Sequence, residues 1–520
     1  MAVGHAQSIA LEGTRRTVIT VECDVSRGLP GISIVGMGDT AVVQAKDRIR
    51  SALKNSGVGW PGSRTVMSLS PAGLPKQGAG YDLAMVCAML SAVADDALGA
   101  GRLSGAVLVG ELGLDGQVRP VQGVFALVLA AAMEGFSTVV VPVGNEAEAA
   151  EAAAAVDGSI TVLVARNLGG VIDWLRGGVL PEACPGEHAA PRPVGDLADV
   201  LGQPAACRAV EVAAAGGHNL LLTGPPGSGK SMLAERLPGI LPPMTDSERI
   251  EAASVHSLAG VKGNLPEVLA GQRPFIAPHH NVTPAALIGG GRIPVPGAVS
   301  LAHHGVLFID EVAEARRDSL ECLRVPMEQR RVELMRAQRI SSFPADFQLV
   351  LAANPCPCGA ELPIDCRCPS GIRSRYQAKL SGPLRDRVDV FAATTGRPQI
   401  EGLKNFGEPS ATVAQRVAEA RDRARQRWGA ASNALVPGKI LRQVGVDESG
   451  SLLLEDMLRT GTITQRGVDR AIRVAWTLAD LDHAAAPHLG HISDAVELFG
   501  ADSELASREP ASREPAEAQR

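Results

Sequence analysis

The fold of this 520-residue chain is decided by the stretch Leu220-Leu221-Leu222-Thr223-Gly224-Pro225-Pro226-Gly227-Ser228-Gly229-Lys230-Ser231. Its first four residues form an apolar run typical of a buried strand, and a helical pattern begins near Ser231-Met232-Leu233. A glycine-rich turn between a strand and a helix is the setting in which a phosphate-binding loop works. The stretch therefore predicts a P-loop α/β domain. The alternative, a chance glycine turn, does not account for both flanking elements.

The loop residues Gly224–Ser231 are expected to hold the triphosphate of ATP together with Mg²⁺. The glycines let backbone N–H groups close around phosphate oxygens, and the helix N-terminus adds the positive end of a dipole. Lys230 should reach the β- and γ-phosphates, and Ser231 should ligate Mg²⁺.

Two later apolar strands end in side chains that suit the same chemistry. Residues 306–309 lead into Asp310 and Glu311, on a strand expected to neighbour that of the loop. Asp310 should orient Mg²⁺ through its water shell, and Glu311 should activate the attacking water as a general base. Residues 348–353 lead into Asn354, whose amide is suited to holding that water. An ordinary acidic pair and a turn-capping asparagine are the alternatives, and the P-loop upstream favours the functional interpretation.

The rest of the chain divides by composition. We expect an N-terminal domain of alternating strands and helices with its own core, a Gly/Pro-rich linker, a second α/β unit, a helical region and a disordered polar tail. These parts span residues 1–175, 176–193, 194–397, 408–500 and 501–520.

The bulk composition limits the classes of partner. The formal net charge is −6, so no global positive field draws the chain to polyanions, and any nucleic-acid binding must use local basic patches. The N-terminus lacks a secretory pattern, and no apolar stretch reaches the ~20 residues that a membrane helix needs. We therefore expect a cytoplasmic protein with no membrane partner.

Four of the nine cysteines are clustered, in an insert at residues 356–368. They form a C-x-C pair followed by a second C-x-C pair: Cys356, Cys358, Cys366 and Cys368. Four thiolates this close in sequence can complete a tetrahedral Zn²⁺ site, although C-x₂-C is the usual spacing. Reduced structural thiols and a disulfide are the alternatives, and a reducing cytosol disfavours the disulfide. The five scattered cysteines are expected to be free thiols in cores.

Several long strings resemble the AAA+ superfamily and, more narrowly, the ComM/YifB family of magnesium-chelatase-like ATPases. These strings are Arg273–His280, Ala286–Gly291, Gly297–Gly305 and Ala353–Gly359, and the likeness spans roughly residues 1–495. The family lies in the AAA+ branch that also holds the MCM helicases and the chelatase motor subunits. The resemblance implies a ring-forming ATPase, usually a hexamer, with a helical lid after the ATPase core.

The resemblance also implies roles for arginines. Arg387, in the segment Leu384–Asp389, is similar in place to the arginine finger that enters a neighbouring subunit's site. Arg385 stands where the family usually has leucine and is a competing candidate. Arg466, at the start of a C-terminal helix, resembles the second sensor, with Arg470 as the alternative. Without the family likeness, solvated charges on helix faces would be the better interpretation.

The segment Val332–Ala337 resembles a β-hairpin that projects into the ring pore of MCM-like motors. That likeness places Arg336, with Arg339 nearby, against a DNA backbone. Basic residues on the inner wall of a ring would supply sequence-independent attraction in spite of the acidic net charge. The alternative is an ordinary exposed hairpin.

Residues 69–135 resemble the proteolytic domain of Lon, with residues 75–84 aligned to its serine segment and residues 110–123 to the segment leading to its lysine. A serine–lysine dyad needs a hydroxyl to attack and an amine to take its proton. The serine position falls on Gly80 and the lysine position on Leu127, so neither step is possible. We expect a catalytically dead Lon-like α+β domain, of the kind that serves related DNA-repair ATPases as an assembly or DNA-binding platform.

Three functions from different classes remain. The first is a ring-forming DNA translocase or helicase, acting on single-stranded or branched DNA and promoting branch migration in recombination or DNA uptake. The second is a chelatase motor that drives Mg²⁺ into a porphyrin, which the fused Lon-like domain disfavours. The third is a regulatory module with an idle ATPase, which the intact Lys230, Asp310 and Glu311 disfavour.

Overall fold

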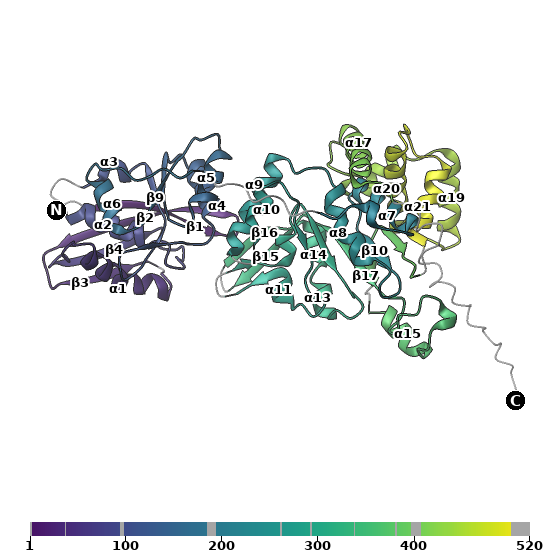
Figure 1. The fold of residues 1–520 in the computed structure, drawn as a ribbon, viewed down its shortest axis with the longest axis horizontal. Helices are drawn as coiled ribbons and strands as arrows, with labels where there is room; N and C mark the ends of the chain where they lie inside the picture. Colours follow the sequence, from purple (N-terminus) through teal and green to yellow (C-terminus); the bar gives the residue numbers. More distant parts are fainter. Residues whose placement is uncertain are drawn as a thin grey trace, which may run out of the picture.

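The computed structural model shows a mixed α/β molecule in three consecutive parts. Figure 1 shows the N-terminal unit in purple, the central domain in teal and the C-terminal helices in yellow-green along the long axis. The described residues are 3–36, 38–93, 98–184, 194–260, 263–291, 294–336, 339–379, 382–396 and 407–500. The expected disordered tail and residues 185–193 of the expected linker lie outside them. Within the described ranges, no helix is both long and apolar enough to cross a membrane.

The N-terminal unit is built on a seven-stranded sheet of order β3-β4-β2-β1-β5-β8-β9. The strands are β1 (Gly4–Glu12), β2 (Arg15–Ser26), β3 (Gly31–Val35), β4 (Arg64–Ser70), β5 (Ala106–Leu108), β8 (Thr138–Pro142) and β9 (Thr161–Ala165), and a small hairpin adds β6 (Glu111–Leu112) and β7 (Val118–Arg119). The β1–β2 and β2–β4 pairs are antiparallel, whereas the pairs linking β1, β5, β8 and β9 are parallel. Residues 180 and 181 also belong to this unit: the Val164 N–H of β9 donates to the Pro181 carbonyl, and Leu180 is buried.

Helices cover both faces of this sheet. They are α1 (Thr40–Asn55), α2 (Asp82–Val93), α3 (Ala100–Leu103), α4 (Val124–Met133), α5 (Glu146–Ala154) and α6 (Leu168–Leu175). Side chains of α1, α2 and α6 form the core on one face, and those of α4 and α5 form the core on the other.

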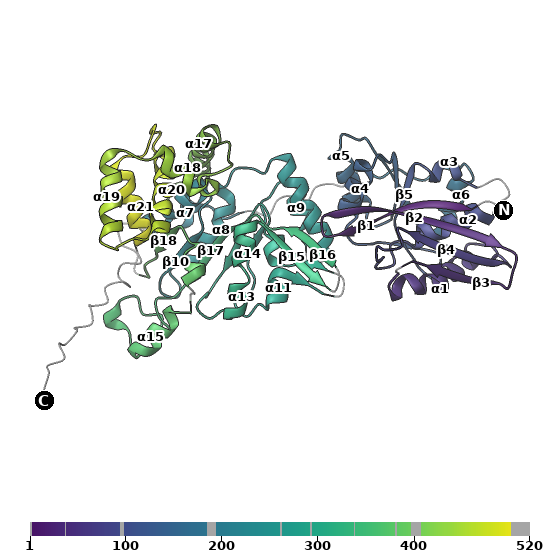
Figure 2. The same cartoon turned by 180° about the vertical axis from the view of Figure 1, so that it is seen from behind.

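Two helices of the central domain complete the second face. Helices α9 (Asp246–Ala259) and α10 (Leu265–Leu269) bury Ala252, Ala253 and Val268 in the same core as α4 and α5. Figure 2 shows α9 at the junction of the two units. Ser257 Oγ donates to Glu148 Oε2 at 2.9 Å inside this contact. The N-terminal unit and the central domain therefore share a hydrophobic core.

The central domain contains a parallel five-stranded sheet of order β11-β14-β17-β10-β18. Its strands are β11 (Phe275–Ile276), β14 (Val306–Ile309), β17 (Gln348–Ala353), β10 (Leu220–Thr223) and β18 (Val390–Ala393). The predicted P-loop strand, acidic strand and Asn354 strand are confirmed as β10, β14 and β17. The expectation that β14 neighbours β10 is wrong, because β17 pairs with both and lies between them. All three strands are parallel, so their carboxyl ends still meet at one edge.

Helices and two hairpins surround this sheet. The helices are α7 (Pro204–Gly216), α8 (Lys230–Ile240), α11 (Pro284–Ile288), α12 (Ala298–Leu301), α13 (Arg317–Glu321), α14 (Arg324–Gln329), α15 (Ser370–Gln377) and α16 (Gly382–Arg385). The hairpins are β12 (Gly289–Gly290) with β13 (Val295–Pro296), and β15 (Arg331–Arg336) with β16 (Arg339–Pro344). In Figure 1 the chain around α15 projects as a separate lobe.

The C-terminal region is helical, as predicted. It contains α17 (Ser410–Trp428), α18 (Gly438–Val444), α19 (Glu448–Arg459), α20 (Gln465–Leu481) and α21 (Leu489–Gly500). α20 and α17 share one hydrophobic core with α7 and with β10. The buried His218, just ahead of β10, bonds Thr477 of α20 through its Nε2 at 2.8 Å. The lid is thus packed directly against the strand that leads into the P-loop.

Candidate nucleotide-binding site

The P-loop has the backbone that close phosphate approach requires. Gly227 and Gly229 have φ values of 76° and 89°, in the left-handed region that favours glycine. Helix α8 starts at Lys230, one residue before the expected position. Its N-terminal N–H groups therefore face the space beyond β10, as an anion site needs.

Lys230 is held at the mouth of this loop. Its Nζ donates to the carbonyl oxygens of Gly224 at 2.7 Å and Pro225 at 2.8 Å, and to Asn354 Oδ1 at 3.2 Å. Burial lowers the pKa of Lys230, and the nearby carboxylates of Asp310 and Glu311 oppose that shift. The buried ammonium group is thus bonded only to neutral oxygens among these partners. Charged phosphate oxygens would bind it more strongly and could replace them.

Ser231 and Asp310 meet as a magnesium site requires. Ser231 Oγ donates to Asp310 Oδ2 at 2.8 Å, although the two residues come from α8 and from the end of β14. A hydroxyl and a carboxylate oxygen are the hard ligands that Mg²⁺ prefers. The donor set fits the predicted Mg²⁺, with the triphosphate oxygens and water completing the shell.

Glu311 has a partner that sequence reasoning missed. Its Oε2 lies 3.1 Å from Nδ1 of His280, and its side chain is 49% exposed. Its backbone is held at φ 47°, while its N–H donates to Asp310 Oδ1 at 2.8 Å. The pair His279–His280 lies in the segment Arg273–His280 that resembles the family, but the sequence alone assigned these histidines no function. The structure thus places an imidazole on the candidate general base.

Of the two arginine-finger candidates, Arg385 is the last residue of α16 and Arg387 lies in the turn that follows. Arg387 forms an ion pair with Glu328 of α14. The guanidinium of Arg385 lies 6.0 Å from the centroid of the Phe391 ring. The two side chains therefore point to different neighbours, and the preference for Arg387 stays a prediction.

The second-sensor candidates flank the same turn. Arg466 is 78% exposed, and its Nη1 lies 3.7 Å from Asp386 Oδ2. Arg470 is 7% exposed and donates to the carbonyls of Val388 at 2.8 Å and Asp386 at 2.9 Å. Arg470 thus stabilises the turn by bonding to backbone carbonyls of residues 386 and 388, whereas the guanidinium of Arg466 is exposed to solvent.

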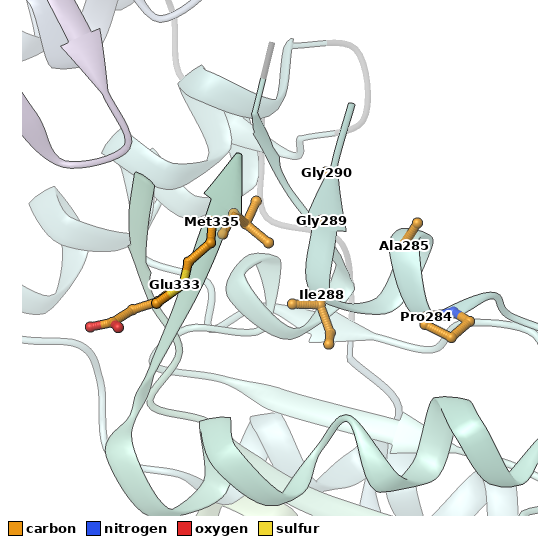
Figure 3. A pocket seen from close by; sticks show the side chains of 8 residues that line it. Pro284, Ala285, Ile288, Gly289, Gly290, Glu333 and Met335 are labelled. Carbon is orange, nitrogen blue, oxygen red and sulfur yellow. The ribbon is translucent and has the colours of Figure 1, made fainter. Parts of the chain in front are cut away.

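The candidate DNA hairpin forms as predicted. Arg336 and Arg339 face each other across β15 and β16 at the end of the ladder, and their side chains lie outside the description. A groove of about 310 Å³ runs between this hairpin and β12. In Figure 3 it lies between Ile288–Gly290 on one side and Glu333–Met335 on the other. Met335 is 71% exposed there.

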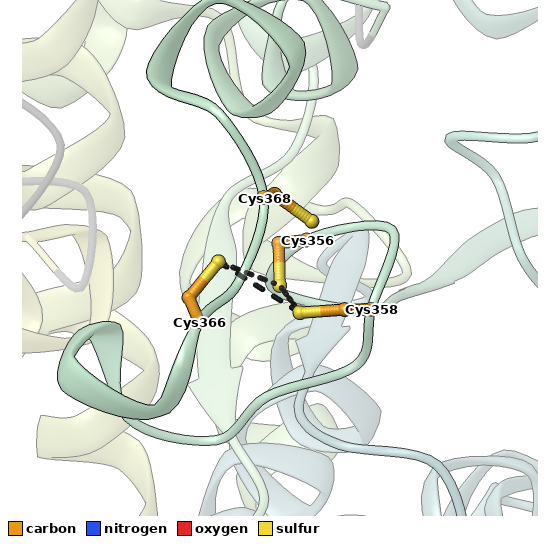
Figure 4. A group of neighbouring side chains, drawn as sticks. All are labelled: Cys356, Cys358, Cys366 and Cys368. Carbon is orange, nitrogen blue, oxygen red and sulfur yellow. Dashed lines mark hydrogen bonds between the residues drawn. The ribbon is translucent and has the colours of Figure 1, made fainter.

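The four clustered cysteines come together (Figure 4). Their sulfur atoms all lie within 4.8 Å of one another. Cys356 Sγ is 3.1 Å from Cys358 Sγ and 3.5 Å from Cys366 Sγ, and the sulfurs of Cys358 and Cys366 are 3.8 Å apart. A tetrahedral Zn–thiolate site with bonds of ~2.3 Å has sulfurs ~3.8 Å apart, so the cluster fits Zn²⁺. Of the scattered cysteines, Cys184 is exposed, which corrects the expectation of a core position; its segment lies at the end of the first domain.

A second group of possible ligands does not suit a metal. Glu251 Oε2 lies 3.2 Å from His303 Nε2 and 3.0 Å from His304 Nε2. The backbone N–H of Asp346 donates to His303 Nδ1 at 3.1 Å, so the neutral ring carries its proton on Nε2. A ligand nitrogen must be free of its proton. The group is better described as hydrogen bonds from histidines to Glu251, led by the His303 bond, which lower the pKa of Glu251 to about 2.

The expected dyad positions of the Lon-like unit carry no nucleophile or base. Gly80 has no side chain, and Leu127, on α4, is buried in the core. A lysine does lie buried in this unit, since Lys76 is fully enclosed and its amine donates to the Pro71 carbonyl. Burial lowers the pKa of Lys76.

Comparison with known proteins agrees with this geometry. Models of the magnesium chelatase subunit ChlI match residues 21–145 and 196–401, and a model of its C-terminal part matches residues 407–498. A protein of Mycobacterium tuberculosis is 46% identical over 95% of this chain and 98% of its own length. YifB of Escherichia coli is 38% identical over 97% of this chain and 98% of its own length. The competence protein ComM of Haemophilus influenzae is 38% identical over 95% of this chain and 97% of its own length.

A further match covers only the N-terminal unit. Lon protease of Mycolicibacterium smegmatis is 32% identical over 151 residues, which are 28% of this chain and 19% of that protease. The near full-length relatives carry the family assignment. The chain belongs to the magnesium-chelatase ChlI-like family of AAA+ proteins that includes YifB and ComM, whose members are typically ATPases.

Proposed function

We propose that this chain is a cytoplasmic, ring-forming, ATP-driven DNA translocase that promotes branch migration during recombination or DNA uptake. The observation that carries the ATPase part is the meeting of Lys230, Ser231, Asp310 and Asn354 at one edge of the central sheet, with Glu311 directly after Asp310. The DNA part is supported by the hairpin of β15 and β16 and by a relative that is named a competence protein.

Each side chain has a step in hydrolysis. Lys230 exchanges its bonds to the P-loop carbonyls for bonds to the β- and γ-phosphates. Asn354 holds the attacking water in line, and Glu311 takes its proton as the new bond to the γ-phosphorus forms. The bond from the γ-phosphorus to the β,γ-bridging oxygen breaks at the same time, and ADP leaves. Ser231 and Asp310 would hold Mg²⁺, which would neutralise charge on the phosphate oxygens.

The site is completed by a neighbouring protomer of a homo-oligomer, most simply a hexamer. Arg387 enters the adjacent site and stabilises charge that develops on the γ-phosphate, and Arg466 contacts the same nucleotide as the second sensor. Arg387 must leave Glu328 to do so, and the 61% exposure of that glutamate makes the exchange inexpensive.

The hairpin of β15 and β16 would carry the DNA contact. Arg336 and Arg339 stand at its tip, where their charges would attract the phosphate backbone of a single-stranded or branched substrate without reading its sequence. The Lon-like unit, without a dyad, would serve as a platform for assembly or DNA binding.

The four clustered cysteines would bind Zn²⁺. The sulfurs of Cys356, Cys358 and Cys366 are 3.1 to 3.8 Å apart, and all four sulfurs lie within 4.8 Å of one another. This spacing supports the proposal, because thiols held this close without a metal would repel on ionisation. Metal analysis of protein purified without chelator tests it: one zinc per chain is expected, and a substoichiometric content would refute it.

The function is tested by ATPase assays with no DNA, single-stranded DNA and a four-way junction. DNA should raise turnover, and Glu311→Gln should lower kcat by about 10²- to 10⁴-fold while nucleotide still binds. Glu321→Gln, an acid exchange on α13, is the matched control. If no DNA changes the rate and a porphyrin-chelatase partner does, the family likeness to chelatase subunits would give the better function.

A further inference from the structure

The cysteine insert, residues 356–368, is in van der Waals contact with the P-loop. Gly359 lies between Cys358 and the rest of the insert, with φ +71°, and its N–H donates to the Cys356 carbonyl at 2.9 Å. A Cβ added at Gly359 would lie 2.7 Å from Cδ and 2.8 Å from Cγ of Pro226. These distances are shorter than side-chain contacts allow, so the turn that carries two of the cysteines is in direct contact with the nucleotide loop.

A second connection runs through hydrogen bonds. Glu361 Oε1 accepts from Thr395 Oγ1 at 2.5 Å and from Gly396 N–H at 3.2 Å. Gln203 Nε2 donates to the Thr395 carbonyl at 2.6 Å and to the Ser228 carbonyl at 3.2 Å. Gln203 is 8% exposed, so its bonds are largely shielded from water, whereas Glu361 is half-buried. The insert thereby shares a hydrogen-bond network with the P-loop backbone.

A third connection reaches Asn354. Tyr376 of α15 is 5% exposed and hydrogen-bonds the backbone of Asn354. The side chain of Asn354 in turn accepts from Lys230, and Cys356 follows two residues later. The insert therefore supports both the loop and the residue that faces it.

The insert has little apolar packing of its own. Between Pro355 and Lys379, Cys356 and Tyr376 are the buried side chains among those described. Leu362, Ile364 and Ile372 are 48%, 89% and 48% exposed. A segment without a core needs a crosslink or a metal to hold one shape. The four sulfurs are the groups here that can provide it.

We propose that metal occupancy of the four-cysteine cluster positions the P-loop, so that nucleotide affinity follows zinc content. This inference rests on the Zn²⁺ binding proposed above. When the metal holds the thiolates, Gly359 stays in contact with Pro226, and Glu361 stays hydrogen-bonded to Thr395. When the metal is absent, the insert is less ordered, and its three connections to the P-loop and Asn354 weaken.

The test measures affinity for mant-ADP and zinc content on the same full-length protein. Zinc is removed with a mercurial reagent, followed by excess thiol, and then restored. We expect the Kd for mant-ADP to rise at least ten-fold on removal and to recover on zinc addition. Cys366→Ser should behave like the stripped protein, and Cys184→Ser, outside the cluster, is the matched control.

A second variant tests the contact with the metal still bound. Gly359→Ala should weaken mant-ADP binding several-fold while keeping one zinc per chain, because the new methyl group displaces Pro226. Gly371→Ala, in the same lobe with nothing within 4 Å of its added Cβ, should bind as the parent does.

The outcomes separate the proposals. Stoichiometric zinc whose removal leaves the Kd unchanged, together with normal binding by Gly359→Ala, overturns this inference and leaves the translocase and the zinc site standing. Protein that never contains zinc overturns the inference together with the zinc site. Parent protein that binds zinc but no nucleotide overturns the ATPase proposal itself.

Discussion

The stability of the junction between the two domains should depend on the neutral form of one histidine. His256 of α9 is 1% exposed and uses both ring nitrogens. The Asn264 N–H donates to its Nδ1 at 2.7 Å, and its Nε2 bonds the Leu301 carbonyl at 2.9 Å. The ring is therefore neutral with its proton on Nε2. Burial is the main cause that lowers the pKa of His256 to about 4.

The sign and size of the pH effect follow from that pKa. In the unfolded chain this ring is protonated below about pH 6.5, whereas in the folded chain it is protonated only below about pH 4. Stability is thus fully present above pH 6.5 and falls as the pH drops from there to 4. At pH 5 the loss is about 2 kcal/mol, and it approaches about 3 kcal/mol below pH 4.

The assay is hydrogen exchange of the α9 amides at pH 7.5 and pH 5, corrected for the intrinsic rate at each pH. His256→Gln should be less stable than the parent at pH 7.5, and this gap should shrink by about 2 kcal/mol at pH 5, because glutamine does not titrate. His5→Gln, exposed on β1, is the control. A gap between parent and His256→Gln that is the same at both pH values would show that His256 is not held neutral.

Other changes test the remaining contacts. Arg387→Ala should lower kcat by about 10³-fold or more without loss of ATP binding, and mixing it with Glu311→Gln subunits, which keep the arginine, should restore part of the turnover if the finger acts between protomers. Replacing Arg336 and Arg339 together with Ala should abolish DNA stimulation while basal ATPase remains, and should reduce the salt dependence of DNA binding by about two units of slope. Ser257→Ala should destabilise the domain junction by about 1–3 kcal/mol in urea unfolding, because Glu148 then loses a donor in a buried site.

Much of the ATPase core was predictable because its signals are local. The apolar runs at β10, β14 and β17 are continuous, as buried parallel strands are, and each ends in a polar residue that the parallel sheet then gathers at one edge. The order of the strands was not local information. Neighbours in sequence suggested β10 beside β14, whereas the sheet inserts β17 between them.

Contacts between distant segments escaped prediction for the same reason. His280 and Glu311 are far apart in sequence, and no periodicity links an imidazole in a loop to a strand end. Helix α9 reads as an ordinary amphipathic helix, so its burial against α4 could not be foreseen. Only the family likeness pointed to Arg387 and Arg466, and their proposed roles depend on the proposed assembly with neighbouring copies of the chain.

The shared core at α9 bears on how the two domains can cooperate. One side of this helix buries Ala253 with the N-terminal unit, while Glu251 and His256 bind the chain at residues 301–304, directly before β14. That strand ends at Asp310 and Glu311. A load on the N-terminal unit would therefore reach the acidic pair through helix α9 and strand β14. For a motor with a platform domain, this arrangement favours direct mechanical coupling between platform and hydrolysis over independent domain motion.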